Sequence, residues 1–412
     1  MSIGKRRYMK KHSNTPQIRF QNFEAEWLDS TIGRHISLLN GRAYKQEELL
    51  DEGKYRVLRV GNFNTNSKWY YSNLELEENK YVNKGDLLYL WATNFGPEIW
   101  TEEKAIYHYH IWKLEFDRTE INQDYLNIWL ESDKNKIQQN TNGSTMVHIT
   151  KTMMEERGIS LPNFDEQSAI GSLFRTLDEL LTSYKDNLVN YQSLKATMLS
   201  KMFPRAGQTV PEIRLDGFEG EWENIRLGDY AIIKGRLGWK SLKQEEYTEV
   251  GPSMIAGKHI KNGVIDWGEV DHIPQWRYDE SPDIMLENGD IIFSKDGSLG
   301  NPALVSNLKG EATINSTMML VRLNKKISSQ FFYQVLTSSV FQKLIYLKVS
   351  GSSIPHLFQA DMQDFKFYAP SIEEQRAIGL YFSNLDSLIN SQQEKISQLE
   401  TLKKKLLQDM FI

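Results

Sequence analysis

Two short segments contain residue types that are used for phosphate binding or methyl transfer, and each departs from the pattern that this chemistry requires. A phosphate-binding loop has four residues between its glycines and then a Lys followed by Ser or Thr. The segment from Gly251 to Gly257-Lys258-His259 has one residue too many and a histidine where magnesium would be held. Asn301-Pro302-Ala303-Leu304 lacks the second proline and the aromatic ring with which DNA amino-methyltransferases hold a flipped base. The sequence therefore predicts neither a nucleotide site nor a methyl-donor site.

Carboxylates and histidines give no stronger case for a metal-dependent centre. Pro282-Asp283 is not followed at a suitable distance by an acidic-x-Lys pair, and Pro97-Glu98 has Glu102-Glu103-Lys104 too close behind it. On a strand, His108 and His110 would share a face and could bind a metal, but ordinary hydrogen bonding explains them better. The chain has no cysteine, which excludes disulfides, thiolate zinc sites and thiol nucleophiles. We expect no catalytic residue, metal or cofactor in this chain.

The elements around these segments occur twice in the sequence. Residues 16–33 match residues 211–228 at Pro16/Pro211, Ile18/Ile213, Arg19/Arg214, Phe23/Phe218, Glu24/Glu219, Glu26/Glu221, Trp27/Trp222 and Gly33/Gly228. A second match runs without a gap from Pro162 to Phe203 and from Pro370 to Phe411, and 16 of its 42 positions are identical. Gly143-Ser144 and His148 upstream match Gly351-Ser352 and His356. The chain is therefore two copies of one unit, each a globular part followed by a helix.

The repeated tail segment has the apolar spacing of a long helix. Its stripe is Ile170, Leu173, Leu177, Leu180, Leu181, Tyr184, Leu188, Tyr191, Leu194, Met198 and Met202 in the first copy. In the second copy it is Ile378, Tyr381, Leu385, Leu388, Ile396, Leu399, Leu402 and Leu406, interrupted once by Gln392. A helix of about 40 residues is about 60 Å long. Because one small domain cannot bury such a stripe, we expect the two helices to pair as an antiparallel coiled coil with a domain at each end.

Each helix also begins with a capping signal. Pro162 and Asn163 stand before Glu166, and Pro370 and Ser371 stand before Glu374. This places an N-cap side chain three residues before a glutamate that can reach back to the cap.

The globular parts indicate a mixed α/β (α+β) fold with more strand than helix. We predict strands at 55–60, 86–91, 105–113, 290–294 and 318–323, and short helices near 125–131 and 330–347. The predicted domains are a basic tail at 1–14, a first domain at 15–158, a helical spacer at 159–204, a second domain at 205–366 and a second spacer at 367–412. Between the repeated flanks the two interiors share little sequence, as expected if a common scaffold supports two different binding faces.

The Pro-x-x-x-Glu-Gln-x-Ala-Ile-Gly helix start at Pro162 and at Pro370, the Gly-Ser segment with its histidine and the duplication together resemble the specificity subunits of type I restriction-modification enzymes. The resemblance covers essentially the whole chain. It implies two target recognition domains that read the two halves of a bipartite double-stranded DNA target, with a spacer set by the helices. It further implies two methyltransferase subunits, which use S-adenosylmethionine and flip an adenine, and two motor-nuclease subunits, which use ATP and magnesium. Those cofactors would bind the partners and not this chain.

Base-reading residues do not follow from the resemblance, so candidates are chosen as polar or basic side chains beside turns. In the first domain they are Arg42, Lys45, Asn62, Asn64, Asn66, Lys68, Asn142, Ser144 and Thr145. In the second domain they are Arg236, Lys240, Lys258, Lys261, Asn262, Lys295, Ser298, Ser352 and Ser353. Trp69, Tyr70, Tyr71 and Trp239 fit DNA packing or a core equally well, whereas Trp27 and Trp222 are assigned to structure.

The charge of the chain weighs against a nucleic-acid role. The net charge is -5, so phosphate contacts require local basic surface or a partner. The basic start (Lys5, Arg6, Arg7, Lys10 and Lys11) fits phosphate contact or a solubilising tail. With no apolar span or signal-peptide core, we expect a cytoplasmic protein. The alternatives are a duplicated coiled-coil scaffold, the recognition subunit of another DNA-defence assembly, and an enzyme with a divergent centre.

Overall fold

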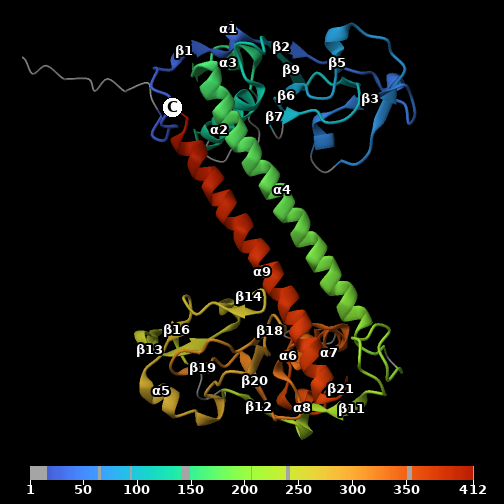
Figure 1. Ribbon diagram of the computed structural model, residues 1–412, viewed down its shortest axis with the longest axis vertical. Helices are drawn as coiled ribbons and strands as arrows, with labels where there is room; N and C mark the ends of the chain where they lie inside the picture. Colours follow the sequence, from blue (N-terminus) through green and yellow to red (C-terminus); the bar gives the residue numbers. More distant parts are fainter. Residues whose placement is uncertain are drawn as a thin grey trace, which may run out of the picture. The chain divides into compact units, whose positions relative to one another are not determined.

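The computed structural model describes residues 16–63, 66–92, 95–140, 149–205, 207–237, 242–349 and 355–411 (Figure 1). The chain forms two compact units. Unit 1 comprises residues 1–183 with residues 396–412, and unit 2 comprises residues 184–395. The predicted domain boundaries follow the repeat, whereas each compact unit also includes parts of both long helices.

Unit 1 is built on two four-stranded sheets and one strand pair. The sheet orders are β2-β9-β6-β7 and β4-β3-β8-β5, and β1 pairs with β10. The elements are β1 (Leu28–Thr31), α1 (Ile32–His35), β2 (Ile36–Asn40), β3 (Tyr55–Leu58), β4 (Tyr70–Ser72), β5 (Tyr81–Val82), β6 (Leu87–Leu90), β7 (Gly96–Ile99), β8 (Ala105–Tyr107), β9 (Ile111–Phe116), α2 (Gln123–Asn140), α3 (Lys151–Glu155), β10 (Gly158–Leu161) and the first half of α4 (Phe164–Lys201).

Unit 2 repeats this plan. Its sheet orders are β12-β20-β17-β18 and β16-β13-β19, β11 pairs with β21, and β14 and β15 form a separate hairpin. The elements are β11 (Glu223–Arg226), β12 (Ala231–Gly235), β13 (Thr248–Ile255), β14 (Ile260–Lys261), β15 (Val264–Ile265), β16 (Asp271–His272), α5 (Gln275–Asp279), β17 (Ile291–Ser294), β18 (Gly300–Leu304), β19 (Ala312–Ile314), β20 (Met318–Leu323), α6 (Ser329–Thr337), α7 (Ser339–Val349), α8 (Gln359–Gln363), β21 (Lys366–Ala369) and α9 (Ile372–Asp409). In both units one inner strand pair is parallel, β3 with β8 and β13 with β19.

Two predicted elements, one strand and one helix, are each divided into two in the structure. The predicted strand at 105–113 is two strands, β8 and β9, because the chain turns at His108–His110 between them. The predicted helix at 330–347 is likewise two helices, α6 and α7, with Ser338 between them. Ser338 has an extended backbone, and its hydroxyl donates to the carbonyl of Val335 instead of continuing the helix.

Equivalent aromatic residues form the centre of each core. In unit 1 the ring of Phe411 lies 5.9 Å from Tyr125 and 6.0 Å from Phe174, next to Trp27. In unit 2 the rings of Phe331, Phe382 and Trp222 surround Phe203 at 5.6, 6.3 and 6.0 Å. Trp27 and Trp222 are buried, as predicted for structural residues. Phe203 follows the last residue of α4 by two positions and Phe411 follows that of α9 by two, so each core is completed by the segment that ends the helix from the other copy of the repeat.

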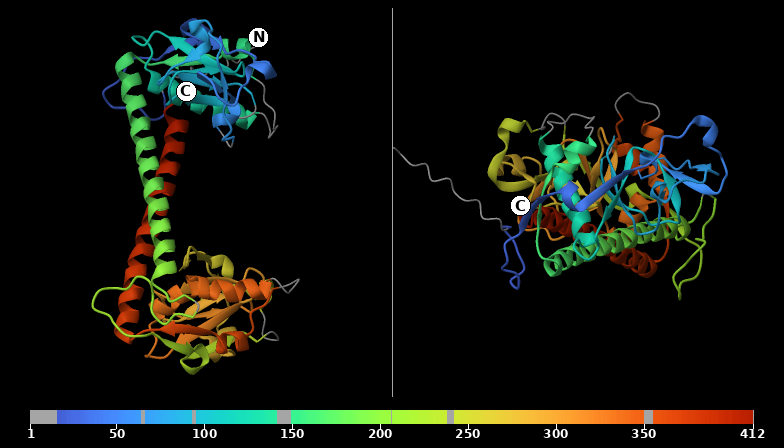
Figure 2. Two further views of the ribbon diagram at one scale, coloured as in Figure 1. Left: turned by 90° about the vertical axis from the view of Figure 1, so that its right-hand side faces the viewer. Right: turned by 90° about the horizontal axis from the view of Figure 1, so that it is seen from above.

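The two long helices are antiparallel and share a repeated ion pair. In unit 2 the ammonium of Lys195 on α4 contacts Asp386 of α9 at 2.5 Å, and the two helices run side by side there in Figures 1 and 2. In unit 1 the ammonium of Lys403 on α9 contacts Asp178 of α4 at 2.8 Å. Asp178 and Asp386 are equivalent in the repeat, as are Lys195 and Lys403. One interhelical contact is thus made twice, which fixes the register of the pair.

The predicted N-caps are confirmed, but the predicted contact of each glutamate with its cap is not. Asn163 accepts a hydrogen bond from the backbone of Glu166 at 2.9 Å, and Ser371 accepts one from Glu374 at 3.3 Å, so the N-caps are as predicted. The glutamates do not reach back to the caps. Glu166 instead binds Arg19 through two hydrogen bonds of 2.7 Å. A guanidinium offers a bidentate, charge-assisted partner that outcompetes a backbone amide.

The rest of the repeated helix start is also structural. The Gln167 side chain donates to the carbonyls of Pro162 and Glu120 and accepts from the backbone of Asn122, joining α4 to the start of α2. A Cβ on Gly171 would lie 2.8 Å from the backbone nitrogen of Tyr125. Gln375 and Gly379 make the equivalent contacts in unit 2. The motif therefore docks each long helix on its own domain.

Candidate nucleic-acid interface

Four strands of unit 1 end at one edge, where the segments that follow them are hydrogen-bonded to one another. The backbone amide of His108, after β8, donates to the carbonyl of Leu58 at the end of β3. The amide of Trp91, after β6, donates to His110 at 3.2 Å. The amide of Arg42, after β2, donates to Tyr107 at 3.0 Å. The described residues 41–45, 59–63, 66–68, 91–92 and 108–110 thus form a single surface, termed face 1.

Unit 2 has equivalents of two of these three backbone hydrogen bonds at the corresponding edge. The amide of Asn315 donates to Ile255 at 3.0 Å, and the amide of Lys295 donates to Thr317 at 2.9 Å. The amide of Leu357 adds a bond to the carbonyl of Lys295. The segments 256–262, 295–299, 315–317 and 355–357 form this surface, termed face 2.

The turn that follows β3 in face 1 and the turn that follows β13 in face 2 are closed by the same kind of hydrogen bond. In face 1 the Asn62 side chain accepts from the amide of Arg59 at 3.0 Å, and in face 2 His259 Nδ1 accepts from Ala256 at 3.0 Å. The side chains around this shared backbone differ. Equivalent positions carry Arg59 and Ala256, Trp91 and Lys295, His108 and Asn315, Tyr109 and Ser316, and His110 and Thr317. One scaffold therefore supports two chemically different faces.

The described candidates of the first domain lie on or beside face 1. The Arg42 guanidinium binds Glu48 at 2.7 Å and lies over the ring of Tyr44, and Lys45 next to it is exposed. Asn62 and Asn66 shape the loop, because their side chains bond to backbone groups within residues 59–68. Lys68 is exposed over the ring of Tyr70.

In the second domain, Lys258, Lys261, Asn262, Lys295 and Ser298 lie on face 2. Seven further candidates lie outside the described residues: Asn64, Asn142, Ser144, Thr145, Lys240, Ser352 and Ser353. The basic start at residues 1–14 and Trp239 also lie outside them.

Arg236 is a correction to the predicted set. Its side chain is fully buried, and its guanidinium donates to the carbonyl of Ile314 at 3.0 Å and to the hydroxyls of Ser281 and Thr313 at 3.3 Å. Burial lowers the pKa of this guanidinium. A group held in this way cannot reach DNA, so Arg236 braces the segments behind face 2.

The lysines of face 2 are paired with carboxylates of the same chain. Lys258 contacts Asp271 at 2.9 Å, Lys261 contacts Asp266 at 2.8 Å, and Lys295 contacts Asp296 at 2.6 Å. DNA phosphates would have to compete with these carboxylates, which weakens sequence-independent attraction. The negative net charge of the chain is therefore accompanied, on this surface, by lysines whose charge is offset by a neighbouring carboxylate.

Face 1 carries aromatic and histidine side chains that the candidate set did not include. The rings of Trp91, Tyr109 and His110 lie within 4.0–6.0 Å of one another, and Tyr109 is 39% exposed. The Arg59 guanidinium lies 4.2 Å from the ring centre of Tyr70. Their position in the sequence could have indicated them, because Arg59 directly follows β3 and Trp91 directly follows β6.

The histidine cluster is a turn and not a strand face. His108 is half-buried, and its pKa is lowered to about 4 by burial, by His110 and by Arg59, so the ring is neutral at pH 7. Among the described residues, no three His, Asp or Glu side chains are grouped so as to hold a metal ion. Within the same residues, no helix is long and apolar enough to cross a membrane.

Comparison with known proteins identifies the family to which this chain belongs. The family model of the type I restriction modification DNA specificity domain matches twice, at residues 24–190 and at residues 219–401. The chain belongs to this family. The two matches correspond to the two copies found in the sequence. As a member of the specificity-domain family, the chain is a DNA specificity subunit of the type I restriction-modification class.

Similar proteins of the same class align over nearly the full length of this specificity subunit. The MjaVIII specificity subunit of Methanocaldococcus jannaschii is 23% identical, with 96% of this chain and 95% of that protein covered. The EcoBI specificity subunit of Escherichia coli is 21% identical, with 93% and 85% covered. The crystal structure of a type I S subunit from M. genitalium matches with a TM-score of 0.67 and 19% identity, covering 97% of this chain and 99% of that one. That match supports the fold.

Proposed function

We propose that face 1 and face 2 each read one half of a bipartite double-stranded DNA target. The observation that carries this proposal is the pair of equivalent backbones with different side chains, which suits the reading of two different base sequences by one architecture. Guanidinium, ammonium, amide and hydroxyl groups are the groups that bind base edges and phosphates. The aromatic and histidine rings of face 1 add stacking surface that face 2 lacks at the equivalent positions.

The proposal includes partner subunits. Two methyltransferase subunits and two motor-nuclease subunits would assemble with the chain, and S-adenosylmethionine, ATP and magnesium would bind there. Exposed leucines on both long helices support docking of partners along them: Leu180 and Leu194 on α4, and Leu388 and Leu402 on α9, are 39–45% exposed. Partner surfaces would also supply phosphate contacts that a chain of net charge -5 lacks. A non-catalytic role and a cytoplasmic location stay predictions.

The first experiment maps methylated bases across the genome of cells that carry a compatible methyltransferase subunit, with and without this gene. A bipartite methylated motif that depends on the gene supports the proposal. Assembly of the complex without any new motif would favour a scaffold. Methylation or cleavage of DNA by the purified chain alone would favour an enzyme.

Variants then assign each half-site to a face. Arg59→Ala on face 1 and Lys258→Ala on face 2 should each relax one half of the motif and leave the other half unchanged, with about 1–3 kcal/mol of discrimination lost per base contact. The matched controls are Lys54→Ala, at the opposite end of β3, and Lys325→Ala, beyond the far end of β20. Both controls should leave the motif intact, and relaxation of both halves by one variant would contradict the assignment.

A further inference from the structure

The β14–β15 hairpin carries part of face 2 and ends in a tight turn at Asn262 and Gly263. Both residues have a positive φ, 52° and 77°, which is the backbone of the two-residue turn that favours Asn-Gly. The hairpin pairs Ile260 with Ile265 and Lys261 with Val264. Its base is supported by Asn301, whose side chain donates to the carbonyls of Gly257 and Ile260.

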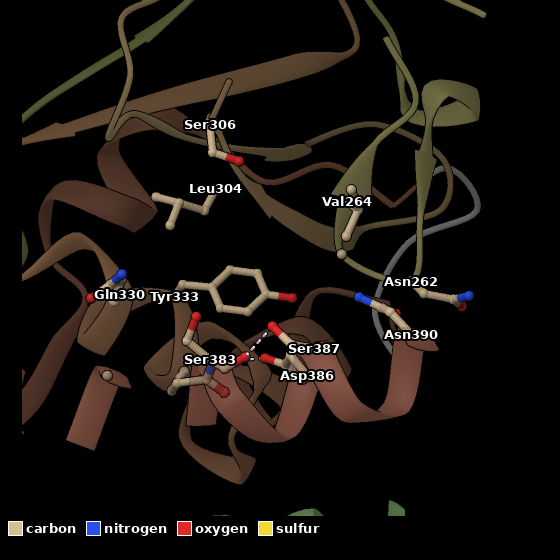
Figure 3. Close-up of a pocket in the computed structure, with 13 residues that line it drawn as sticks. Asn262, Val264, Leu304, Ser306, Gln330, Tyr333, Ser383, Asp386, Ser387 and Asn390 are labelled. Atoms are coloured by element: carbon tan, nitrogen blue, oxygen red, sulfur yellow. Dashed lines mark hydrogen bonds between the residues drawn. The ribbon is translucent and has the colours of Figure 1, made fainter. Parts of the chain in front are cut away.

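The tip of this hairpin contacts the long helix α9 and not open solvent alone. The side-chain amide of Asn262 donates to Gln393 Oε1 on α9 at 2.8 Å. The neighbouring Gly263 lies over Tyr333 of α6, and a Cβ at that position would stand 2.0 Å from the tyrosine hydroxyl oxygen. Figure 3 shows the Tyr333 hydroxyl directed toward the hairpin, with Asn390 of α9 beside Asn262. Two different helices therefore meet the turn.

Only the end of the hairpin, at Asn262, Gly263 and Val264, borders open space. A cavity of about 210 Å³ lies there, lined mainly by polar side chains, among them Ser306, Gln334, Ser387 and Asn390 (Figure 3). A cavity of this size and polarity can hold several waters and gives little apolar packing. The hairpin strands are anchored by Ile260 and Ile265, which are buried in the core, and by Asn301 at the base, whereas the tip is held by the contacts at the turn.

We infer that Asn262, Gly263, Tyr333 and Gln393 form a latch that positions Lys261, directly before the turn, for DNA recognition by face 2. This inference rests on the proposed function. It reassigns Asn262, which the sequence suggested as a DNA contact, to a positioning residue. It also gives a specificity role to Gln393 on the spacer helix. Loss of the latch lets the tip of the hairpin shift over the cavity together with Lys261, so binding of the second half-site weakens while the first is unaffected.

A double-mutant cycle separates the latch from a DNA contact. The dissociation constant of the complete methyltransferase complex is measured for the target duplex and for duplexes with one half-site replaced. Asn262→Ala and Gln393→Ala should each weaken target binding about 2- to 10-fold, the range for one hydrogen bond. The double variant should be no weaker than either single variant. If Asn262 alone matters, or if the two effects multiply, the latch is wrong.

A second pair of variants tests the contact with Tyr333. Gly263→Ala should reduce discrimination at the second half-site by about 10-fold or more, because the added Cβ meets the hydroxyl and the φ of 77° strains an alanine. Tyr333→Phe in the Gly263→Ala background should restore part of this loss, since the nearest remaining atom is then 3.2 Å away. Gly268→Ala, beyond the same hairpin, meets no atom closer than 3.5 Å and should have no effect.

The outcomes distinguish the latch from the proposed function. First half-site discrimination reports whether each variant is folded and assembled. Absence of any gene-dependent bipartite motif for the unaltered chain would remove the proposed function itself. An intact bipartite motif together with unchanged second half-site binding in Gln393→Ala and Gly263→Ala would remove the latch alone.

Discussion

Arg19 and Arg214 each form a buried ion pair with the first turn of a long helix, with Glu166 of α4 and Glu374 of α9. Arg214 binds Glu374 through two hydrogen bonds of 2.8 and 2.7 Å, and the glutamate side chain is 1% exposed. The same guanidinium also donates to the carbonyls of Glu219 and Gly220. The repeat of both charged residues marks the pair in the sequence, but the capping pattern concealed it.

Removal of Arg214 from this ion pair should lower the stability of unit 2. Arg214→Met leaves the Glu374 carboxylate buried without its partner, and we expect the free energy of unfolding of unit 2 to fall by about 3–5 kcal/mol. Hydrogen exchange of peptides from β11 and β21, followed with increasing urea, measures the loss. The control is Arg226→Ala, which removes an exposed pair with Asp364 and should cost less than about 1 kcal/mol. Equal losses in the two variants would contradict the structural role of the buried pair.

The candidate site also shows what single residues in a sequence reveal. The choice of polar residues beside turns selected Lys258, Lys261 and Lys295, which lie together on face 2 because the ends of neighbouring strands converge at one edge; their contact with DNA stays a prediction. The same rule failed for Arg236, since residue type does not report burial, and it missed Arg59, which directly follows a strand. The contact of Asn262 with α9 was beyond sequence reasoning, because it joins residues far apart in the chain through one side-chain hydrogen bond.

At the scale of elements, the apolar period located both long helices closely. The predicted spacers at 159–204 and 367–412 contain α4 (Phe164–Lys201) and α9 (Ile372–Asp409). The period could not show what the last turns contact, because it reports which residues are apolar and not their partners. Several stripe residues, such as Leu180 and Leu388, remain exposed in this chain. Only the structure shows that Phe203 and Phe411 enter domain cores.

This arrangement makes the end of α9 part of the first domain. Phe411 is 5% exposed, and Phe411→Ala leaves a cavity beside Tyr125 and Phe174, so we expect unit 1 to lose about 3–5 kcal/mol of stability. Hydrogen exchange should rise in β1, β10 and α2 while the β11 and β21 peptides of unit 2 keep their protection. Met153→Ala, an exposed residue of unit 1, serves as the control. Unchanged exchange in unit 1 would show that the helix end is dispensable.

At the scale of the whole molecule, duplication explains how one chain is suited to two different half-sites. The sequence revealed the two copies through their flanks, where the residues dock helices and complete cores. It gave little match between the interiors, although the structure has equivalent sheets there. Backbone hydrogen bonds such as those of His108 and Asn315 do not depend on side-chain identity, so the scaffold persists while the faces diverge.

The repeated ion pairs make the length of the helix pair testable. In α4 the same number of residues separates Asp178 from Lys195 as separates Asp386 from Lys403 in α9, so both pairs can form only if the two helices have matching lengths. Four residues inserted after Asn187, together with four after the equivalent Lys395, add one turn of about 6 Å and keep both pairs. We expect the methylated motif to keep its two half-sites and gain about two base pairs of spacer, at about 3.4 Å per base pair. Insertion after Asn187 alone cannot satisfy both pairs and should reduce methylation at every spacer length. Genome-wide mapping of methylated bases measures both variants, and an unchanged spacer in the double insertion would show that the helices do not set the distance between half-sites.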